Sequence, residues 1–239
     1  MNKIIREGLR FFLPADKTFW KLYAPVIRIL KDSHEHLLIR QKINTYFELG
    51  KQDRVLEEGC GKAVWLSEVR AQVGLAVGLD IEMGMLKNAS GAHLVRADLN
   101  AGMPFEDGAF SKVGSILVEG YLRERDLALQ ERYRVLSPGG MLAIITPRKG
   151  AKFFKVLAAE AKLRKAEQTI VDNLKRLPLA IIAVLFGKIA EMKAIAGDWH
   201  FYEKEELIDK YRRAGFEIVA CESVYAEQAW LLVARKPVL

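Results

Sequence analysis

The chain has 239 residues, of which 51% are hydrophobic and 28% charged, and its formal net charge is +7. This length suits one α/β domain with an insertion, and the apolar content can bury a core without covalent staples. Cys60 and Cys221 are its two cysteines, and neither stands with histidine at metal-ligand spacing. These features argue against a disulfide scaffold and a metal site, and they favour a reducing, cytoplasmic location.

The chain shows no pattern of a targeting or membrane-spanning segment. Residues 1–10 mix charged and apolar side chains and lack the apolar stretch of a signal peptide. The longest apolar run, residues 177–187, contains Pro178 and is shorter than the roughly 20 residues that span a bilayer. We therefore expect a soluble protein, with a peripheral membrane contact left open.

The excess positive charge lies in two segments. Residues 1–50 contain 9 Lys/Arg and 5 Asp/Glu, and residues 148–197 contain 11 and 4. The remaining segments, 51–147 and 198–239, each hold slightly more acidic than basic residues. A basic surface of this kind attracts phosphate, carboxylate or anionic lipid, although a pair of solvated helix faces explains the charge equally well.

Short apolar strands alternate with helices along most of the chain. Helices are expected at residues 17–49, ending at Gly50, and at 64–73, 83–89, 123–136 and 203–214. Strands are expected at residues 54–58, 76–80, 93–97, 111–117, 141–146, 216–224 and 229–235, with a turn at 137–140. The order predicts an α/β fold with a doubly wound, mainly parallel sheet and a C-terminal antiparallel hairpin.

The alternation breaks at residues 148–197, which are rich in Ala, Lys, Leu and Ile. We interpret this segment as an insertion of two or three helices over the carboxyl edge of the sheet. The predicted organisation is an N-terminal helical segment (1–50), a ligand-binding core (51–147 and 198–239) and a helical cap (148–197) that selects the substrate.

The central motif is a buried strand that runs into Gly59-x-Gly61 and then a helix. Small residues there let the backbone approach a ligand, and the helix N-terminus offers free N–H groups. A nicotinamide-binding fold begins in the same way, but its fingerprint needs a third glycine where this chain has Val64. Taken alone, the motif also fits a purely structural turn.

Three acidic residues stand at the ends of the first three strands. Asp80 follows Gly61 by 19 residues, where a carboxylate can accept both hydroxyls of a ribose. Asp98 is placed to accept from an adenine amino group, and Glu57 to pair with an ammonium group. Each could instead cap a helix or lie in a solvated loop. Together they predict a ligand that carries an ammonium, a ribose and an adenine.

These motifs resemble those of the ubiquinone/menaquinone-type branch (methyltransferase type 11) of class I S-adenosylmethionine-dependent methyltransferases. The similarity lies in residues 55–61, 78–86, 97–110, 131–140 and 214–217, and it covers nearly all of 17–147 and 198–237. It implies a Rossmann-like core, S-adenosylmethionine as cofactor and methyl transfer as the activity. Through the resemblance, the cofactor site extends to Tyr23, Cys60, Ile81, Ala97, Leu99 and Ser115.

The sequence departs from the family pattern at several positions. Glu58 replaces an apolar residue within the first strand, and a carboxylate there must be paired or exposed. Lys62 and Ala63 replace the common Thr-Gly pair, which puts the strength of cofactor binding in doubt. Glu119-Gly120-Tyr121 replaces the common Glu-His pair.

The methyl group of a sulfonium is already activated, so the enzyme has mainly to align the acceptor with it. An anionic or amine acceptor needs no dedicated base, whereas a phenol or carbon acceptor does. His200 and Tyr202 lie where the insertion rejoins the core and are the candidate catalytic residues, although His200 also fits a structural role. Cys60 and Cys221 lack the surroundings of a nucleophilic thiol.

The insertion is more apolar than a lid over a sugar requires, as Phe153, Phe154 and Phe186 illustrate. With the basic residues, it suggests a small-molecule or amphiphilic acceptor: lipid-like, isoprenoid or aromatic, with an acidic part. The same side chains could instead pack on the core or in a homodimer. Two alternatives are a non-catalytic S-adenosylmethionine-binding protein and a nucleic-acid methyltransferase. The second is disfavoured because residues 118–121 lack an Asn/Asp-Pro-Pro-aromatic motif.

Overall fold

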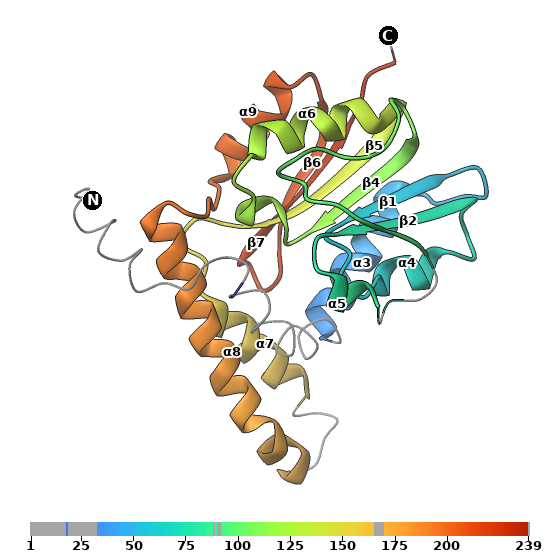
Figure 1. Cartoon of the computed structure of the whole chain (residues 1–239). Helices are drawn as coiled ribbons and strands as arrows, with labels where there is room; N and C mark the ends of the chain where they lie inside the picture. Colours follow the sequence, from blue (N-terminus) through green and yellow to red (C-terminus); the bar gives the residue numbers. More distant parts are fainter. Residues whose placement is uncertain (1–17, 19–32, 88, 90–91, 165–169, 239) are drawn as a thin grey trace.

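A computed structural model describes residues 18, 33–87, 89, 92–164 and 170–238 (Figure 1). A seven-stranded sheet crosses the molecule in the order β3-β2-β1-β4-β5-β7-β6. The strands are β1 (Arg54–Glu58), β2 (Leu75–Asp80), β3 (His93–Arg96), β4 (Phe110–Ile116), β5 (Leu136–Pro147), β6 (Glu217–Val224) and β7 (Ala229–Arg235). Strands β1 to β5 pair in parallel, and β7 pairs antiparallel with both β5 and β6. The predicted parallel sheet with its C-terminal hairpin is therefore confirmed.

Helices cover both faces of this sheet. They are α3 (His34–Phe47), α4 (Val64–Val69), α5 (Met83–Leu86), α6 (Arg125–Val135), α7 (Phe153–Arg164), α8 (Ile170–Ala196) and α9 (Lys204–Arg213), with a 3₁₀ turn η1 (Glu119–Tyr121). Side chains alternate along β5, so Ala143 joins the core under α3 and α4 while Leu142 joins the core under α6 and α9. This two-sided burial is why the strands of the core read as nearly continuous apolar runs.

Helix α3 ends before Gly50, where the sequence predicted the end of the first helix. Its start is capped by Ser33, whose Oγ accepts a hydrogen bond from the His36 amide at 3.3 Å. Its end is at Glu48, which takes the left-handed conformation with φ 47°, and not at Gly50. Gly50 instead donates its amide to Asp53 Oδ2 at 2.8 Å and shapes the turn into β1.

The Pro-Gly-Gly segment was predicted as a turn at 137–140 but belongs to β5. Leu136 already pairs with Phe110, and the register shifts before Lys112 pairs with Met141. The segment is held against the C-terminal end of the chain, because Gly139 donates its amide to the Lys236 carbonyl at 2.8 Å. Since Gly139 has φ 76°, a conformation suited to glycine, the strand continues through an irregular region and does not stop.

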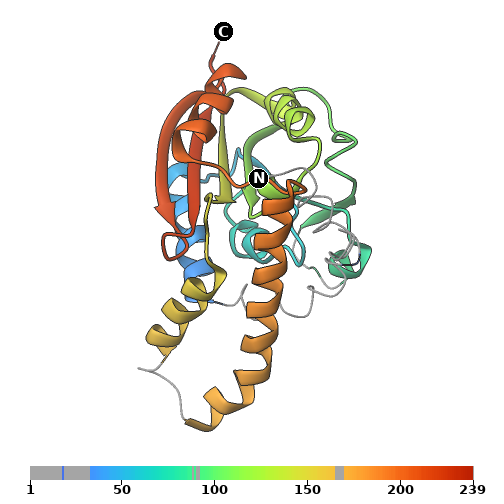
Figure 2. The same cartoon turned by 90° about the vertical axis from the view of Figure 1, so that its left-hand side faces the viewer.

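Helices α7 and α8 form a hairpin that extends away from the sheet in both views (Figures 1 and 2). They approach closely at Gly187, where an added Cβ would lie 2.5 Å from Phe153 Cβ. The chain leaves the core after β5 and returns beside it, through a bridge between Arg148 and Tyr202. Among the described helices, none combines the length and apolar character needed to cross a bilayer.

Candidate active site

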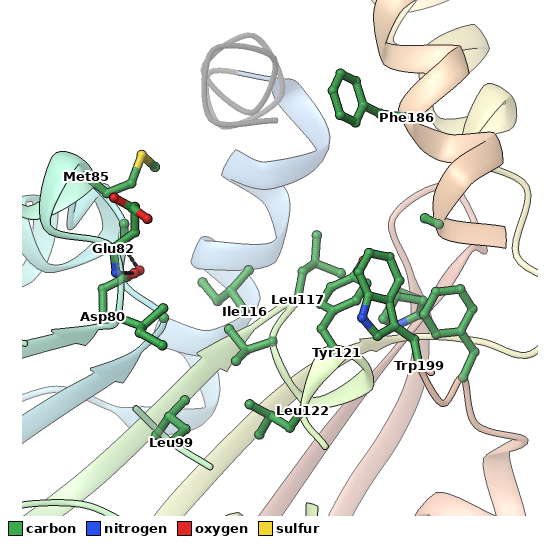
Figure 3. Close-up of a pocket in the computed structure, with 18 of the residues that line it drawn as sticks. Asp80, Glu82, Met85, Leu99, Ile116, Leu117, Tyr121, Leu122, Phe186 and Trp199 are labelled. Carbon is green, nitrogen blue, oxygen red and sulfur yellow. Dashed lines mark hydrogen bonds between the residues drawn. The ribbon is translucent and has the colours of Figure 1, made fainter. Parts of the chain in front are cut away.

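A cavity of about 510 Å³ lies at the carboxyl ends of the parallel strands (Figure 3). Asp80 and Met85 lie on one side of it, and Tyr121 and Trp199 lie on the other. The volume is that of a typical small-molecule site, and ligands of open α/β sheets bind at this edge. The cavity is therefore of a suitable size and in a suitable place for a nucleotide-like ligand.

The glycine loop after β1 forms part of the cavity wall. Gly59 and Gly61 both line it and have φ values of 60° and 55°. A Cβ at Gly59 would overlap Val118 Cγ2, which lies just after the end of the neighbouring strand β4. Glycine is thus required at position 59 by both the backbone conformation and the packing, and the exposed backbone of the loop is left for a ligand.

Asp80, at the end of β2, is held rigidly at the cavity edge. Its Oδ2 accepts from the Gly61 amide at 2.8 Å, and its Oδ1 accepts from the Glu82 amide at 2.9 Å. Glu82 in turn caps α5 by accepting from the Gly84 amide at 3.4 Å. Because each oxygen retains further acceptor capacity, the carboxylate can still bind hydroxyl groups of a ligand.

Asp98 occupies the corresponding place after β3. Its Oδ1 accepts from the Asn100 amide at 2.9 Å and from the Asn100 side chain at 2.8 Å. Asn100 Oδ1 then accepts from the amides of Arg123 and Glu124, at 2.9 and 3.0 Å. This chain of hydrogen bonds fixes the Asp98 loop to the segment that starts α6.

The cavity brings together most of the cofactor-binding residues predicted from the sequence. Those that line it are Gly59, Gly61, Asp80, Ile81, Ala97, Asp98 and Leu99.

Among the residues that the structure describes, three other predicted cofactor residues do not line the cavity. Glu57 and Ser115 are buried below it, at 4% and 0% exposure. Cys60 supports the loop from behind, since a Cβ at Gly78 would lie 2.7 Å from its Sγ. Tyr23 lies outside the described residues.

The two candidate catalytic residues do not reach the cavity either. Tyr202 is 2% exposed and donates its hydroxyl to Glu119 Oε1 at 2.9 Å. Burial and the Glu119 charge raise the pKa of this tyrosine. His200 Nε2 lies 2.6 Å from Glu206 Oε1 on the surface. Both side chains hold the insertion junction to the core, and the cavity is lined by other residues.

An aromatic wall, which the sequence did not identify, faces the carboxylates across the cavity. Tyr121 contacts Trp199 and Phe201 edge to face, with ring centroids 4.7 and 5.9 Å apart. His36 and Tyr225 form a second edge-to-face pair at 5.1 Å, and both also line the cavity. Burial raises the pKa of the Tyr121 phenol and keeps it protonated. Such rings provide a flat apolar surface with specific geometry.

Glu58, the unusual acid in β1, has a partner in the core. Arg132 of α6 donates from Nε and Nη2 to Glu58 Oε2, at 2.9 and 2.7 Å. Arg132 Nη1 also binds Glu119 and lies 3.0 Å from the Tyr211 hydroxyl. The side chains of Glu58, Arg132 and Glu119 are fully buried. The expectation that Glu58 must be paired or exposed is confirmed: it is paired.

The charges of this network reinforce one another. Burial alone would raise the pKa of Glu119, but the charges of Arg132 and Lys210 and hydrogen bonds from Arg132 and Tyr202 lower it. Burial would likewise lower the pKa of Arg132, yet the neighbouring Glu58 and Glu119 raise it well above its ordinary value. Glu119 and Arg132 therefore stay ionised inside the core.

The β6–β7 turn is a strained part of the cavity wall. Tyr225, Ala226 and Glu227 are consecutive and all have positive φ, at 58°, 50° and 61°. The Ala226 amide donates to Glu35 Oε2 of α3 at 3.0 Å, which holds the turn in place. Non-glycine residues in this conformation are costly and gather at functional sites, and here they aim Tyr225 and Gln228 at the cavity.

Comparison with known proteins agrees with this geometry. A family model described as a methyltransferase domain matches residues 56–144, the stretch that contains the glycine loop, Asp80 and Asp98. The demethylmenaquinone methyltransferase of Staphylococcus carnosus is 25% identical over 208 residues, which cover 79% of this chain and 78% of that protein. The malonyl-[acyl-carrier protein] O-methyltransferase of Erwinia billingiae is 31% identical over 113 residues, covering 46% and 45%.

A solved structure shows the same fold. It is a methyltransferase in complex with the Trm112 activator from Haloferax volcanii, with a TM-score of 0.67 and 16% identity, and the match covers 93% of this chain and 98% of that one. The cofactor of these enzymes, S-adenosylmethionine, suits a cavity with a glycine loop on one side and two strand-end carboxylates beside it. Together these findings support a class I S-adenosylmethionine-dependent methyltransferase, and over most of its length the chain is similar to demethylmenaquinone methyltransferases.

Proposed function

We propose that this methyltransferase acts on an amphiphilic acceptor: a quinone-like, isoprenoid or aromatic molecule with an acidic part. The observation that carries the proposal is the continuity of the cavity. From Asp80 it extends without a break to an apolar side built from Phe153, Phe186, Trp199 and Phe201. A small hydrophilic acceptor would not use this surface, whereas burial of an apolar acceptor there is favourable.

The relatives support the same class of acceptor. The Staphylococcus carnosus relative is named for demethylmenaquinone, and its match spans most of both chains. The Erwinia billingiae relative is named for a malonyl group on a carrier protein, but its match covers less than half of this chain. The longer match favours an apolar ring compound over a carrier-bound acid.

The cofactor site is proposed from the residues at the strand ends. Gly59 and Gly61 offer backbone groups to the cofactor, Asp80 accepts from its ribose, and Asp98 accepts from its adenine amino group. Glu57, beneath the loop, is assigned to the ammonium group. Tyr23 is assigned to the cofactor site through the family resemblance alone.

S-adenosylmethionine supplies an activated methyl group, and the residues of this chain then serve mainly to orient the acceptor. Tyr121 and Trp199 form the wall against which a flat ring packs. The protonated Tyr121 phenol can donate a hydrogen bond to an acceptor oxygen. Phe186 of α8 covers the cavity from above and excludes water (Figure 3).

A phenol or carbon acceptor has to lose a proton, and His36 is proposed to take it. It is 7% exposed and is the histidine among the described residues that line the cavity. An imidazole nitrogen can accept a proton, and histidine is the most common general base of enzymes. In wild-type enzyme kcat/KM should fall at acidic pH, and in His36→Gln this fall should be absent. An unchanged pH profile would show that solvent, and not His36, takes the proton.

The test of the acceptor is a turnover assay on a panel of quinols with prenyl chains of increasing length, short aromatic acids and RNA. Release of S-adenosylhomocysteine is measured in the absence of vesicles. Phe186→Ala should lower kcat/KM for the apolar acceptors on the order of tenfold, because a buried phenyl contact is worth about 1.5–3 kcal/mol, and leave the Kd of S-adenosylmethionine unchanged.

Phe154→Ala is the matched control. It removes the same side chain from the same hairpin, but Phe154 is 48% exposed and does not line the cavity. Turnover of the apolar acceptors should stay at the wild-type level in this variant. Transfer to RNA with none to the quinols would overturn the proposal and favour a nucleic-acid methyltransferase.

A further inference from the structure

The α7–α8 hairpin carries several apolar side chains that are exposed to solvent. Phe154 is 48% exposed, Ile181 55%, Ile182 39% and Leu185 59%. Exposed lysines lie beside them in the sequence of both helices. We refer to these residues together as the hairpin face: Phe154, Lys155, Lys162, Ile181, Ile182, Leu185 and Lys188.

This apolar stripe is not the one that packs on the rest of the protein. On α8, Ile181, Leu185 and Lys188 follow each other at helical spacing and form one side. Gly187 and Ala190 lie on the other side and line the cavity. An ordinary surface helix turns its apolar side inward and its polar side to water, so the outward apolar stripe of α8 lacks the usual explanation of core packing.

The charge of the hairpin indicates what this face meets. Residues 148–197 hold 11 Lys/Arg against 4 Asp/Glu. In a symmetric dimer the same face of each copy would meet its equivalent, which would bring two strongly basic segments together. A surface with anionic groups over an apolar layer complements both the lysines and the apolar side chains.

We propose that the hairpin face docks on a lipid membrane that contains anionic headgroups. Phe154, Ile181 and Leu185 enter the boundary between headgroups and acyl chains, and the lysines bind phosphates around them. Both views show the hairpin extending away from the sheet, so the core does not obstruct this approach (Figures 1 and 2). The inner side of the same helices carries Phe153 and Phe186 of the cavity wall.

Flotation of the purified full-length protein with vesicles tests the docking without any acceptor. We expect binding to phosphatidylcholine vesicles that contain phosphatidylglycerol, weaker binding to pure phosphatidylcholine, and a decrease with added salt. Ile181→Gln/Leu185→Gln should weaken binding on the order of tenfold, because its apolar contacts are lost. Lys155→Gln/Lys162→Gln should weaken it to a similar order, with a smaller salt dependence.

Val219→Gln is the matched control, because Val219 is a similarly exposed apolar residue, at 45%, on β6 and outside the hairpin. It should bind as the wild type does, and S-adenosylmethionine binding should show that all variants are folded. No flotation of the wild type, or equal flotation of all variants, would overturn the proposal. Dimerisation that Ile181→Gln/Leu185→Gln abolishes would show a subunit interface instead. Since neither acceptor nor turnover enters the measurement, its outcome is independent of the proposed acceptor.

Discussion

Arg132 and Glu58 are joined by parallel hydrogen bonds between α6 and β1, with Nε 3.0 Å from Oε1 and Nη2 2.7 Å from Oε2, and both side chains are fully buried. Arg132 also binds Glu119, the first residue of η1. Glu58 directly precedes the glycine loop, and η1 ends at Tyr121 of the aromatic wall. One guanidinium thus connects the glycine loop on one side of the cavity to the aromatic wall on the other.

Replacement of Arg132 is expected to be strongly destabilising. Arg132→Met would leave the carboxylates of Glu58 and Glu119 buried without their main cation. Loss of one partner of a buried ion pair costs about 3–5 kcal/mol, so the free energy of unfolding should fall by that amount in urea denaturation at neutral pH.

The double variant Glu58→Leu/Arg132→Met provides the control for this effect. It removes the stranded charge in β1 together with its partner, and Glu119 keeps Lys210 and Tyr202 as neighbours. The two changes should be non-additive, with a coupling free energy of about 1–3 kcal/mol. Simple additivity would show that the ion pair does not act as a unit.

Acid should destabilise the protein through Glu119. Its pKa is lower in the folded state than the ordinary value of 4.5, so folding is favoured while this carboxylate is charged. The stabilisation is complete above the unfolded pKa and is lost as the pH falls through the folded pKa. One such group contributes a slope of at most about 1.4 kcal/mol per pH unit.

Urea denaturation between pH 6 and the acid limit measures this slope. Glu119→Gln should reduce the slope of the unfolding free energy against pH, because a glutamine takes up no proton on unfolding. Asp209→Asn, on the exposed side of α9 with a side chain 62% exposed, should retain the wild-type slope. An equal slope in the wild type and Glu119→Gln would assign the acid response to other carboxyl groups.

Gly187→Ala should separate α7 from α8. The new Cβ would lie 2.5 Å from Phe153 Cβ, closer than carbon atoms pack, so one helix has to move. Overpacking of this kind costs about 1–3 kcal/mol. Because Gly187 and Phe153 both line the cavity, kcat/KM for the acceptor should fall while calorimetry shows an unchanged Kd for S-adenosylmethionine.

Gly50→Ala is a suitable comparison, since the nearest atom to its added Cβ is Asp53 Oδ2 at 3.9 Å. This variant should retain wild-type turnover. If Gly187→Ala did so too, the close approach of the two helices would be irrelevant to the acceptor.

Cys221 should react slowly with alkylating reagents. Burial raises the pKa of its thiol to about 11, and the thiolate is the reactive form. The rate of iodoacetamide labelling should therefore rise about tenfold per pH unit between pH 8 and pH 10. Cys60 is buried and should be labelled only after unfolding. The variant Cys221→Ser allows the labelling of Cys60 to be measured by itself. A labelling rate independent of pH would contradict the raised pKa.

The part of the cavity that is proposed for the cofactor could be predicted from the sequence because its geometry follows from the sheet. Parallel strands end at one edge, so acids directly after β2 and β3 must lie near each other. Asp80 and Asp98 are such residues, and both line the cavity.

The side of the cavity that is proposed for the acceptor could not be predicted, because its residues come from segments that are far apart in the sequence and share no periodic pattern. Tyr121 is in η1, Trp199 follows α8, His36 is in α3 and Tyr225 is in a strained turn. Only the tertiary fold brings them together. A cluster of aromatic residues at 199–202 was visible, but the sequence could not show that Tyr202 turns into the core while Trp199 lines the cavity.

The partner of the buried Glu58 could not be predicted from the sequence either. A partner for Glu58 was expected, and Arg132 lies in a stretch that resembles a family motif. However, 74 positions separate the two residues, and several other arginines were available. The choice depends on α6 packing across β1, which is a property of the assembled layers.

The bridge between Arg148 and Tyr202 closes the loop of chain that contains α7 and α8, and the Lys149 amide reinforces it by donating to the Tyr202 carbonyl at 2.9 Å. The two ends of the hairpin therefore leave the sheet as neighbours, like the stem of an inserted cassette. Exchange of everything beyond that stem would leave the strand order and the glycine loop in place. Under the proposed function, the architecture can thus acquire a new acceptor without changing the way it holds the methyl donor.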